Sequence, residues 1–126
     1  RRQRQMCIRE RECGVHQNYK NKVLKANDIA TMSTGKRLGH PVRSIKNPYT
    51  KEYFKLEYSN ISDEELEAYG RGSLYRAAVE GDEKTGCFLA GQIAGMVNKE
   101  QTAKEIIEEI FTQAEDVLKG ATKWVK

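Results

Sequence analysis

The feature that most constrains this chain is an apolar run over residues 86–97, in a sequence where 32% of the residues are charged. The small residues Ala90, Gly91, Ala94 and Gly95 fall at i, i+1, i+4 and i+5, so a helix here would have one smooth face. A face without bulky side chains lets another backbone or a flat ligand come close. The larger apolar residues would face a core. This spacing favours tight helix packing over a ligand contact.

The composition predicts a helical surface layer or a piece of a larger unit. The chain has 126 residues, at most one domain, and only 38% are hydrophobic. No run of 18 apolar residues and no secretory signal occur, so we expect no membrane span and a cytoplasmic protein. Cys7, Cys13 and Cys87 lack metal-binding spacing, which indicates reduced thiols.

The net charge of +4 does not indicate a nucleic-acid surface. Residues 1–12 hold five Arg and two Glu, whereas the other 114 residues carry seventeen basic and sixteen acidic side chains. Nucleic-acid binding needs a basic stripe within the folded part. We therefore expect no nucleic-acid partner.

The first half of the chain predicts one short helix and two short strands. Apolar residues between positions 16 and 26 fit one helix face, with the lysines of this segment outside. Residues 28–34 alternate as in a strand, and residues 42–45 form a second short strand after a turn-rich loop. A further helix follows Asn47, a credible N-cap, with Pro48 at its first position.

The second half predicts three more helices. A capping box at Ser62 and Glu65 opens a helix over residues 63–69 that Gly70 ends. The next helix starts at residues 72–73 and ends at Gly81. A second capping box, at residues 102–105, opens a long amphipathic helix, and Gly120 sits where its C′ residue is wanted.

Several stretches resemble one family in order and spacing. They are residues 12–20, 39–43, 70–74, 77–82 and 89–97. Together they resemble the C-terminal segment of the flavin-dependent enoyl-[acyl-carrier-protein] reductases (enoyl-ACP reductase II). These form one family of FMN-binding barrels with the nitronate monooxygenases, formerly called 2-nitropropane dioxygenases. The resemblance covers nearly all of residues 12–126.

The resemblance implies an α/β fold in which this chain supplies the C-terminal part of a TIM-type (β/α)8 barrel. Residues 12–126 would form the last barrel helix and a mostly helical cap, predominantly α with two short strands. Residues 1–11 have no apolar period, and we interpret them as a non-native or disordered leader.

The same resemblance implies that Phe88, Leu89, Gly91 and Gln92 bind the cofactor or line the substrate pocket. Relatives usually have Met at position 89 and often Val at position 88, so the pocket stays apolar but its shape differs. Gln92 would orient ligand or loop through its amide. The alternative is a buried amide that satisfies a helix terminus.

No catalytic residue is expected in this chain. His16 and His40 lack partners at metal spacing, and the family's active-site histidine lies upstream of this segment. Cys87 has no adjacent base and is interpreted as a small buried hydrophobic residue. The family's glycine-rich phosphate loops would precede residue 12. We therefore expect no metal and no catalytic group.

The resemblance implies a full-length enzyme that reduces trans-2-enoyl-[acyl-carrier-protein] with NAD(P)H through FMN, in fatty acid biosynthesis. Residues 18–20 and 39–43 favour this branch. One alternative is a nitronate monooxygenase that oxidises small alkyl nitronates with O2, and another is a non-enzymatic helical interaction module. We expect the chain alone to be inactive. The full-length enzyme is a possible homodimer.

Overall fold

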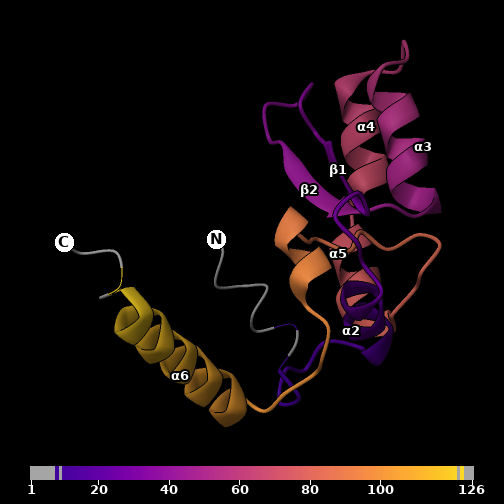
Figure 1. Cartoon of the computed structure of the whole chain (residues 1–126). Helices are drawn as coiled ribbons and strands as arrows, with labels where there is room; N and C mark the ends of the chain where they lie inside the picture. Colours follow the sequence, from indigo (N-terminus) through magenta and orange to yellow (C-terminus); the bar gives the residue numbers. More distant parts are fainter. Residues whose placement is uncertain (1–7, 9, 122, 124–126) are drawn as a thin grey trace.

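The computed structural model describes residues 8, 10–121 and 123 (Figure 1). Its elements are α2 (Gln17–Leu24), β1 (Thr31–Thr34), β2 (Val42–Ile45), α3 (Pro48–Glu57), α4 (Asp63–Gly70), α5 (Ser73–Tyr75), the π-helical turn η1 (Arg76–Glu80), the 3-10 helix η2 (Gln92–Met96) and α6 (Ala103–Ala121). The expectation of a mostly helical chain with two short strands is confirmed.

Strands β1 and β2 form an antiparallel hairpin in which Thr31 pairs with Ile45 and Thr34 with Val42. The bounds of β2 agree with the prediction, but β1 starts later than residue 28. The reason is a turn: Asn27 accepts the Ala30 N–H through its carbonyl at 3.1 Å and the Ile29 N–H through its side chain at 3.2 Å.

The predicted helix over residues 86–97 is wrong for its first half. Residues 87–90 are extended and pair with β2, because the Ile45 N–H donates to the Phe88 carbonyl at 2.8 Å and the Ala90 N–H to the Arg43 carbonyl at 3.1 Å. Leu89 lies opposite Ser44 in this bridge. Pairing with a neighbouring strand overrides the local helical spacing.

The small residues of this run allow another backbone segment to come close, as predicted. A Cβ added at Gly95 would lie 2.8 Å from the Asn27 carbonyl carbon, and Ala94 is fully buried. The expectation that the large residues all face a core is wrong, because Ile93 is 50% exposed and Met96 75%. The short 3-10 turn presents its alanine inward and these two side chains outward.

The helix starts agree with their sequence signals. Asn47 and Thr50 form a reciprocal capping box on α3, with both hydrogen bonds at 2.9 Å. Ser62 and Glu65 do the same on α4. The helix predicted from residues 72–73 is a short α5 that continues into η1, and Gly81 ends it with a φ of +63°. Helix α4 includes Gly70, one residue beyond the predicted end.

Two apolar clusters lie on opposite sides of the extended segment 87–90. One contains Tyr19, Val23, Ile45, Ala77, Phe88, Ala90, Ala94 and Val97. The other contains Tyr49, Tyr53, Leu66 and Cys87, with Leu89 packed against it. Successive side chains of an extended segment point to opposite faces, so this one segment contributes to both clusters.

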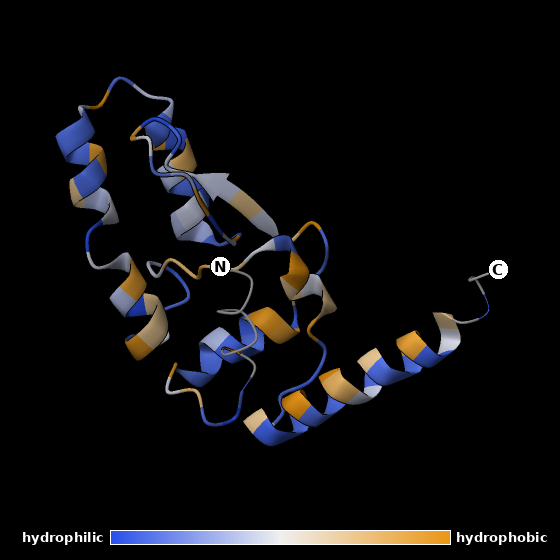
Figure 2. Cartoon of the chain, turned by 90° about the vertical axis from the view of Figure 1, so that its left-hand side faces the viewer, coloured by the Kyte–Doolittle hydropathy of each residue, from blue (hydrophilic) through white to orange (hydrophobic). Residues whose placement is uncertain are grey.

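Helix α6 begins at the predicted capping box, where the Glu105 N–H donates to Thr102 Oγ1 at 3.2 Å. It leads away from the rest of the chain, with an apolar stripe along one side (Figures 1 and 2). Ile106 is buried, whereas Ile107, Ile110, Phe111, Val117 and Leu118 are exposed. Gly120 lies inside the helix, so its predicted C′ role is wrong.

The start of α6 is fastened to the N-terminal region. The Lys20 ammonium lies 2.9 Å from Glu100 Oε1 and also donates to the Arg11 carbonyl at 3.1 Å. Lys20 is 4% exposed, so its predicted outward position is wrong; the ion pair compensates for its burial. The Glu12 carboxylate accepts the Ala103 N–H at 3.1 Å.

The predicted leader, residues 1–11, falls largely on residues 1–7 and 9, which lie outside the described residues. Of the remainder, Arg11 donates its N–H to the Gln101 carbonyl at 2.8 Å, and Glu10 forms a parallel bridge with Gln101. Among the described residues, no helix is long and apolar enough to cross a membrane.

We predict that Gly86→Ala destabilises the fold by about 1–3 kcal/mol, the usual cost of overpacking. The added Cβ would lie 2.5 Å from the Asp82 carbonyl oxygen and 2.8 Å from Ala77 Cα, and both are backbone atoms that cannot rotate away. Urea unfolding measures the change. Gly14→Ala is the control, since no atom lies within 4 Å of its added Cβ. Equal midpoints for the two variants would contradict the close packing.

Candidate functional site

The four residues assigned to a ligand pocket occupy two different environments. Phe88 is fully buried and packs edge-on against Tyr19, with ring centres 5.0 Å apart at 62°. The Lys22 ammonium lies 5.3 Å from the centre of the Phe88 ring, a cation–π distance. Phe88 therefore supports the site from within the core and does not itself reach the surface of the described structure.

Leu89, Gly91 and Gln92 lie together where the extended segment turns into η2. Leu89 and Gly91 are half-buried, and Gln92 is exposed as the first residue of η2. The alternative of a buried amide at Gln92 is wrong, because the short η2 turns this side chain into solvent. Within the described residues, no hydrogen bond engages it. An amide so placed can both donate and accept a hydrogen bond to a ligand.

Two exposed apolar side chains extend this surface. Ile93 and Met96 follow Gln92 on η2. Ile93 is 50% exposed and Met96 75%, so η2 presents apolar groups as well as the Gln92 amide to solvent. Apolar surface with a few polar groups is typical of ligand sites. Their spacing in the sequence indicated a core position for Ile93 and Met96, because local spacing does not distinguish an inward face from an outward one.

The positions of these residues depend on side chains of α2. The Tyr19 hydroxyl donates to the Leu89 carbonyl at 2.8 Å, and Asn18 Nδ2 donates to the Gly81 carbonyl at 3.0 Å. Burial raises the pKa of Tyr19, so the phenol stays a neutral donor. Asn18 and Tyr19 of the motif at residues 18–20 thus hydrogen-bond to the backbone of Gly81 and Leu89, which gives this motif a structural role.

His16 and Cys87 are engaged in the framework. His16 Nδ1 accepts the Asn18 N–H at 3.1 Å, and its ring packs against Gly81. Cys87 is 5% exposed, and burial raises the pKa of its thiol to about 11. The interpretation of Cys87 as a buried hydrophobic residue is confirmed. Within the described part of the chain, no group of three His, Cys, Asp or Glu side chains could hold a metal.

The chain matches a known family and known structures. The sequence model described as nitronate monooxygenase matches residues 7–113. FabK from Thermotoga maritima matches with 34% identity and a TM-score of 0.88, covering 94% of this chain and 37% of that one. A mutant of the same protein matches with 30% identity and a TM-score of 0.78, covering 94% and 35%. No curated protein sequence matches.

The chain belongs to the nitronate monooxygenase family. The family and the fold class predicted from the sequence motifs, a helix-rich segment of the barrel with two short strands, are confirmed. The chain spans little more than a third of the length of FabK. The family match starts five residues before the first motif on which the resemblance was based.

We predict that Tyr19→Phe lowers the free energy of unfolding by about 1 kcal/mol, the value of one hydrogen bond. The change removes the donor to the Leu89 carbonyl while keeping the ring that packs on Phe88. Tyr58→Phe is the matched control, since Tyr58 is 65% exposed. Urea unfolding compares the two variants. Equal stability would show that the Leu89 backbone is held without this hydrogen bond.

We predict that Cys87 reacts about a hundredfold more slowly with a disulfide reagent at pH 8 in the folded chain than in urea. The thiol pKa of about 11, against 9.0 for the free group, leaves about a hundredfold less thiolate. The rate should rise about tenfold per pH unit between pH 8 and 10, because the thiolate fraction grows in this proportion below the pKa. A variant with Cys7→Ser and Cys13→Ser isolates the signal. Equal rates in buffer and urea would exclude a buried thiol.

Proposed function

We propose that this chain is a segment of an FMN-dependent enoyl-ACP reductase. Such an enzyme reduces a trans-2-enoyl thioester on acyl carrier protein with NAD(P)H. The observation that carries the proposal is the match to FabK at 34% identity over 94% of this chain, with a TM-score of 0.88. The motif at residues 18–20, which the resemblance links to this branch, holds the candidate site in place through Tyr19.

Within this proposal, Leu89, Gly91 and Gln92 form a wall of the flavin and acyl-chain pocket. Their chemistry fits such a role: Gln92 offers an amide without a partner in the described part of the chain, and Leu89 offers apolar surface beside it. The amide can donate to an oxygen at the polar edge of a flavin ring or to a thioester carbonyl. FMN, when bound, supplies the transfer of hydride from the nicotinamide.

The chain's own residues bind and orient rather than transfer protons. His16 accepts a backbone N–H through Nδ1, and Cys87 is buried with a raised pKa, so Nδ1 of His16 and the Cys87 thiol both belong to the framework. The buried ring of Phe88 and the Tyr19 hydrogen bond keep the Leu89 backbone fixed. A wall held in this way positions a substrate against the cofactor without reorganising.

We propose that the apolar face of α6 packs on the remaining part of the barrel. Its exposed residues include Phe111 at 67% and Leu118 at 70%, a stripe that a soluble helix normally buries. FabK extends well beyond the segment matched here, so chain is available in that protein to cover such a face. A cytoplasmic enzyme and a homodimer are parts of the same proposal.

A nitronate monooxygenase is the second candidate, because the family model that matches residues 7–113 carries that description. Such an enzyme would oxidise an alkyl nitronate with O2 using the same flavin. The two candidates differ in the substrate that meets the wall formed by residues 89–92. The assay that distinguishes them is therefore a choice between two substrates.

We predict that FabK from Thermotoga maritima stays an enoyl reductase when this chain replaces its matching segment. The chimera should bind FMN and oxidise NAD(P)H only with a trans-2-enoyl thioester, whereas the 126-residue chain alone should oxidise none. If the larger chimera does not fold, the same assays are made on a smaller chimera in which only residues 86–97 are exchanged. Turnover of an alkyl nitronate with O2, without enoyl reduction, would favour the second candidate instead.

We further predict that Gln92→Ala in the chimera lowers kcat/KM for the enoyl thioester about tenfold, the effect of losing one hydrogen bond of about 1.4 kcal/mol. Asn60→Ala removes another exposed amide and should have no effect. Equal rates for these two variants would remove Gln92 from the proposed site.

A further inference from the structure

We infer that Asn47 is a positioning residue for the wall formed by residues 89–92, because its side-chain amide fixes the start of the extended segment that leads into this wall. Asn47 lies between β2 and α3 and is 5% exposed. Its Nδ2 donates to the Gly86 carbonyl at 2.7 Å and to the Glu83 carbonyl at 3.1 Å. The consequence for a substrate rests on the proposed function, whereas the link between α3 and the segment rests on these contacts alone.

The amide of Asn47 uses both of its ends. Its Oδ1 accepts the Thr50 N–H at 2.9 Å and thereby caps α3. Aspartate, serine or threonine would provide such a cap as well, but each lacks the NH₂ group that donates to two carbonyls at once. The need for asparagine at this position therefore comes from Gly86 and Glu83 rather than from the helix.

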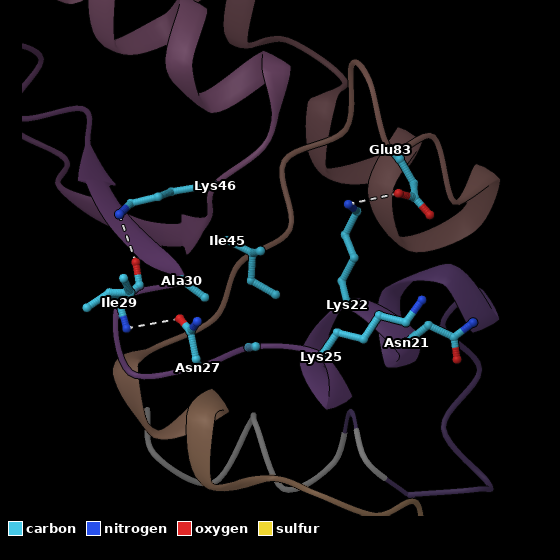
Figure 3. Close-up of a pocket in the computed structure, with 10 residues that line it drawn as sticks. Asn21, Lys22, Lys25, Asn27, Ile29, Ala30, Ile45, Lys46 and Glu83 are labelled. Carbon is cyan, nitrogen blue, oxygen red and sulfur yellow. Dashed lines mark hydrogen bonds and ion pairs between the residues drawn. The ribbon is translucent and has the colours of Figure 1, made fainter.

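The backbone that carries this amide is itself fixed. The Lys46 N–H donates to the Ala30 carbonyl at 2.8 Å, and the Lys46 ammonium donates to the Ile29 carbonyl at 2.7 Å (Figure 3). The Asn47 N–H donates to Thr50 Oγ1 at 2.9 Å, and Thr50 is fully buried. A side chain on such a support can determine where a neighbouring segment lies.

The loop that receives the amide is held from the opposite side by α2. The Glu83 carboxylate pairs with the Lys22 ammonium at 2.9 Å (Figure 3). Three residues further along the extended segment from Gly86, the Tyr19 hydroxyl donates to the Leu89 carbonyl at 2.8 Å. Side chains from two different elements thus hold the segment at Gly86 and at Leu89, and the wall begins at the second of these points.

The test variant is Asn47→Asp, which keeps the acceptor for the Thr50 N–H but places an oxygen against the two carbonyls. An ionised carboxylate repels both carbonyl oxygens, whereas a protonated carboxyl group can donate to one of them. Burial and the two carbonyls raise the pKa of a carboxyl group at this position above the ordinary value of about 3.9. The link should therefore be lost at pH 7 and partly restored as the pH falls through the raised pKa.

Hydrogen exchange of the 126-residue chain, followed by NMR, reads the position of the segment directly. The Ala90 N–H donates to the Arg43 carbonyl and the Ile45 N–H to the Phe88 carbonyl, so these two amides report the pairing. We expect Asn47→Asp to lower their protection about tenfold at pH 7, the effect of losing hydrogen bonds to buried carbonyls, and less at pH 5. Protection is corrected for the intrinsic exchange rate at each pH.

A second variant, Asn47→Ser, tests the same link without a buried charge. Its hydroxyl can still cap α3, but it ends one bond closer to the backbone and leaves both carbonyls without the amide donor. The loss of protection should be about tenfold at both pH values. This variant decides the test if Asn47→Asp does not fold.

The FabK chimera gives the functional readout. At pH 7, Asn47→Asp should lower kcat/KM for the enoyl thioester about tenfold relative to the parent chimera, because a displaced wall misplaces the substrate. The ratio of variant to parent should rise toward pH 5. The ratio for Asn47→Ser should stay low at both pH values, since a serine hydroxyl does not titrate in this range.

The matched control is Ser62→Ala, which removes the cap of α4, where Ser62 Oγ accepts the Glu65 N–H at 3.2 Å. It should lower the protection of the Ala90 and Ile45 amides no more than that of other amides. An equal loss at all protected amides in the Asn47 variants, or a loss in Asn47→Asp that does not change with pH, would overturn the inference. The expected exchange pattern beside an inactive parent chimera would count against the proposed function alone.

Discussion

The pairing of residues 87–90 with β2 is the interaction on which the rest of this structure depends. Two backbone hydrogen bonds, from Ile45 to Phe88 and from Ala90 to Arg43, hold this segment extended. Because its side chains alternate, Phe88 enters the cluster under α2 while Cys87 enters the one under α3 and α4. One segment thereby joins two small cores, neither of which is large enough to stand as a separate domain.

Polar side chains with more than one partner fix the ends of this segment. Asn47 caps α3 through its oxygen and donates through Nδ2 to the Gly86 carbonyl at 2.7 Å, so it sets the start of a helix and of the extended segment together. The Tyr19 hydroxyl holds the Leu89 carbonyl. Buried backbone carbonyls need such partners, which explains why amide and phenol side chains occur inside an otherwise apolar region.

The same arrangement positions the candidate ligand surface. The wall at Leu89, Gly91 and Gln92 emerges where the extended segment leaves the cores and becomes η2. Phe88 connects α2 to this surface, since its ring packs against Tyr19 and lies near the Lys22 ammonium, and its backbone continues into Leu89. One buried side chain thus helps to hold the backbone from which the candidate surface emerges.

The sequence by itself determined the features whose physics is local. Capping boxes at Ser62 and Thr102 and the N-cap Asn47 satisfy nearby N–H groups, so helix starts could be predicted, and the ordered motifs predicted the family. The tertiary structure decided what depends on distant partners. Pairing with β2 holds residues 87–90 extended where a helix was expected. The ion pair with Glu100 allows Lys20 to be buried. The 3-10 helix η2 places the Gln92 side chain in solvent. The strand pairing and the ion pair each join residues far apart in the chain, and contacts of that kind leave no local pattern in a sequence.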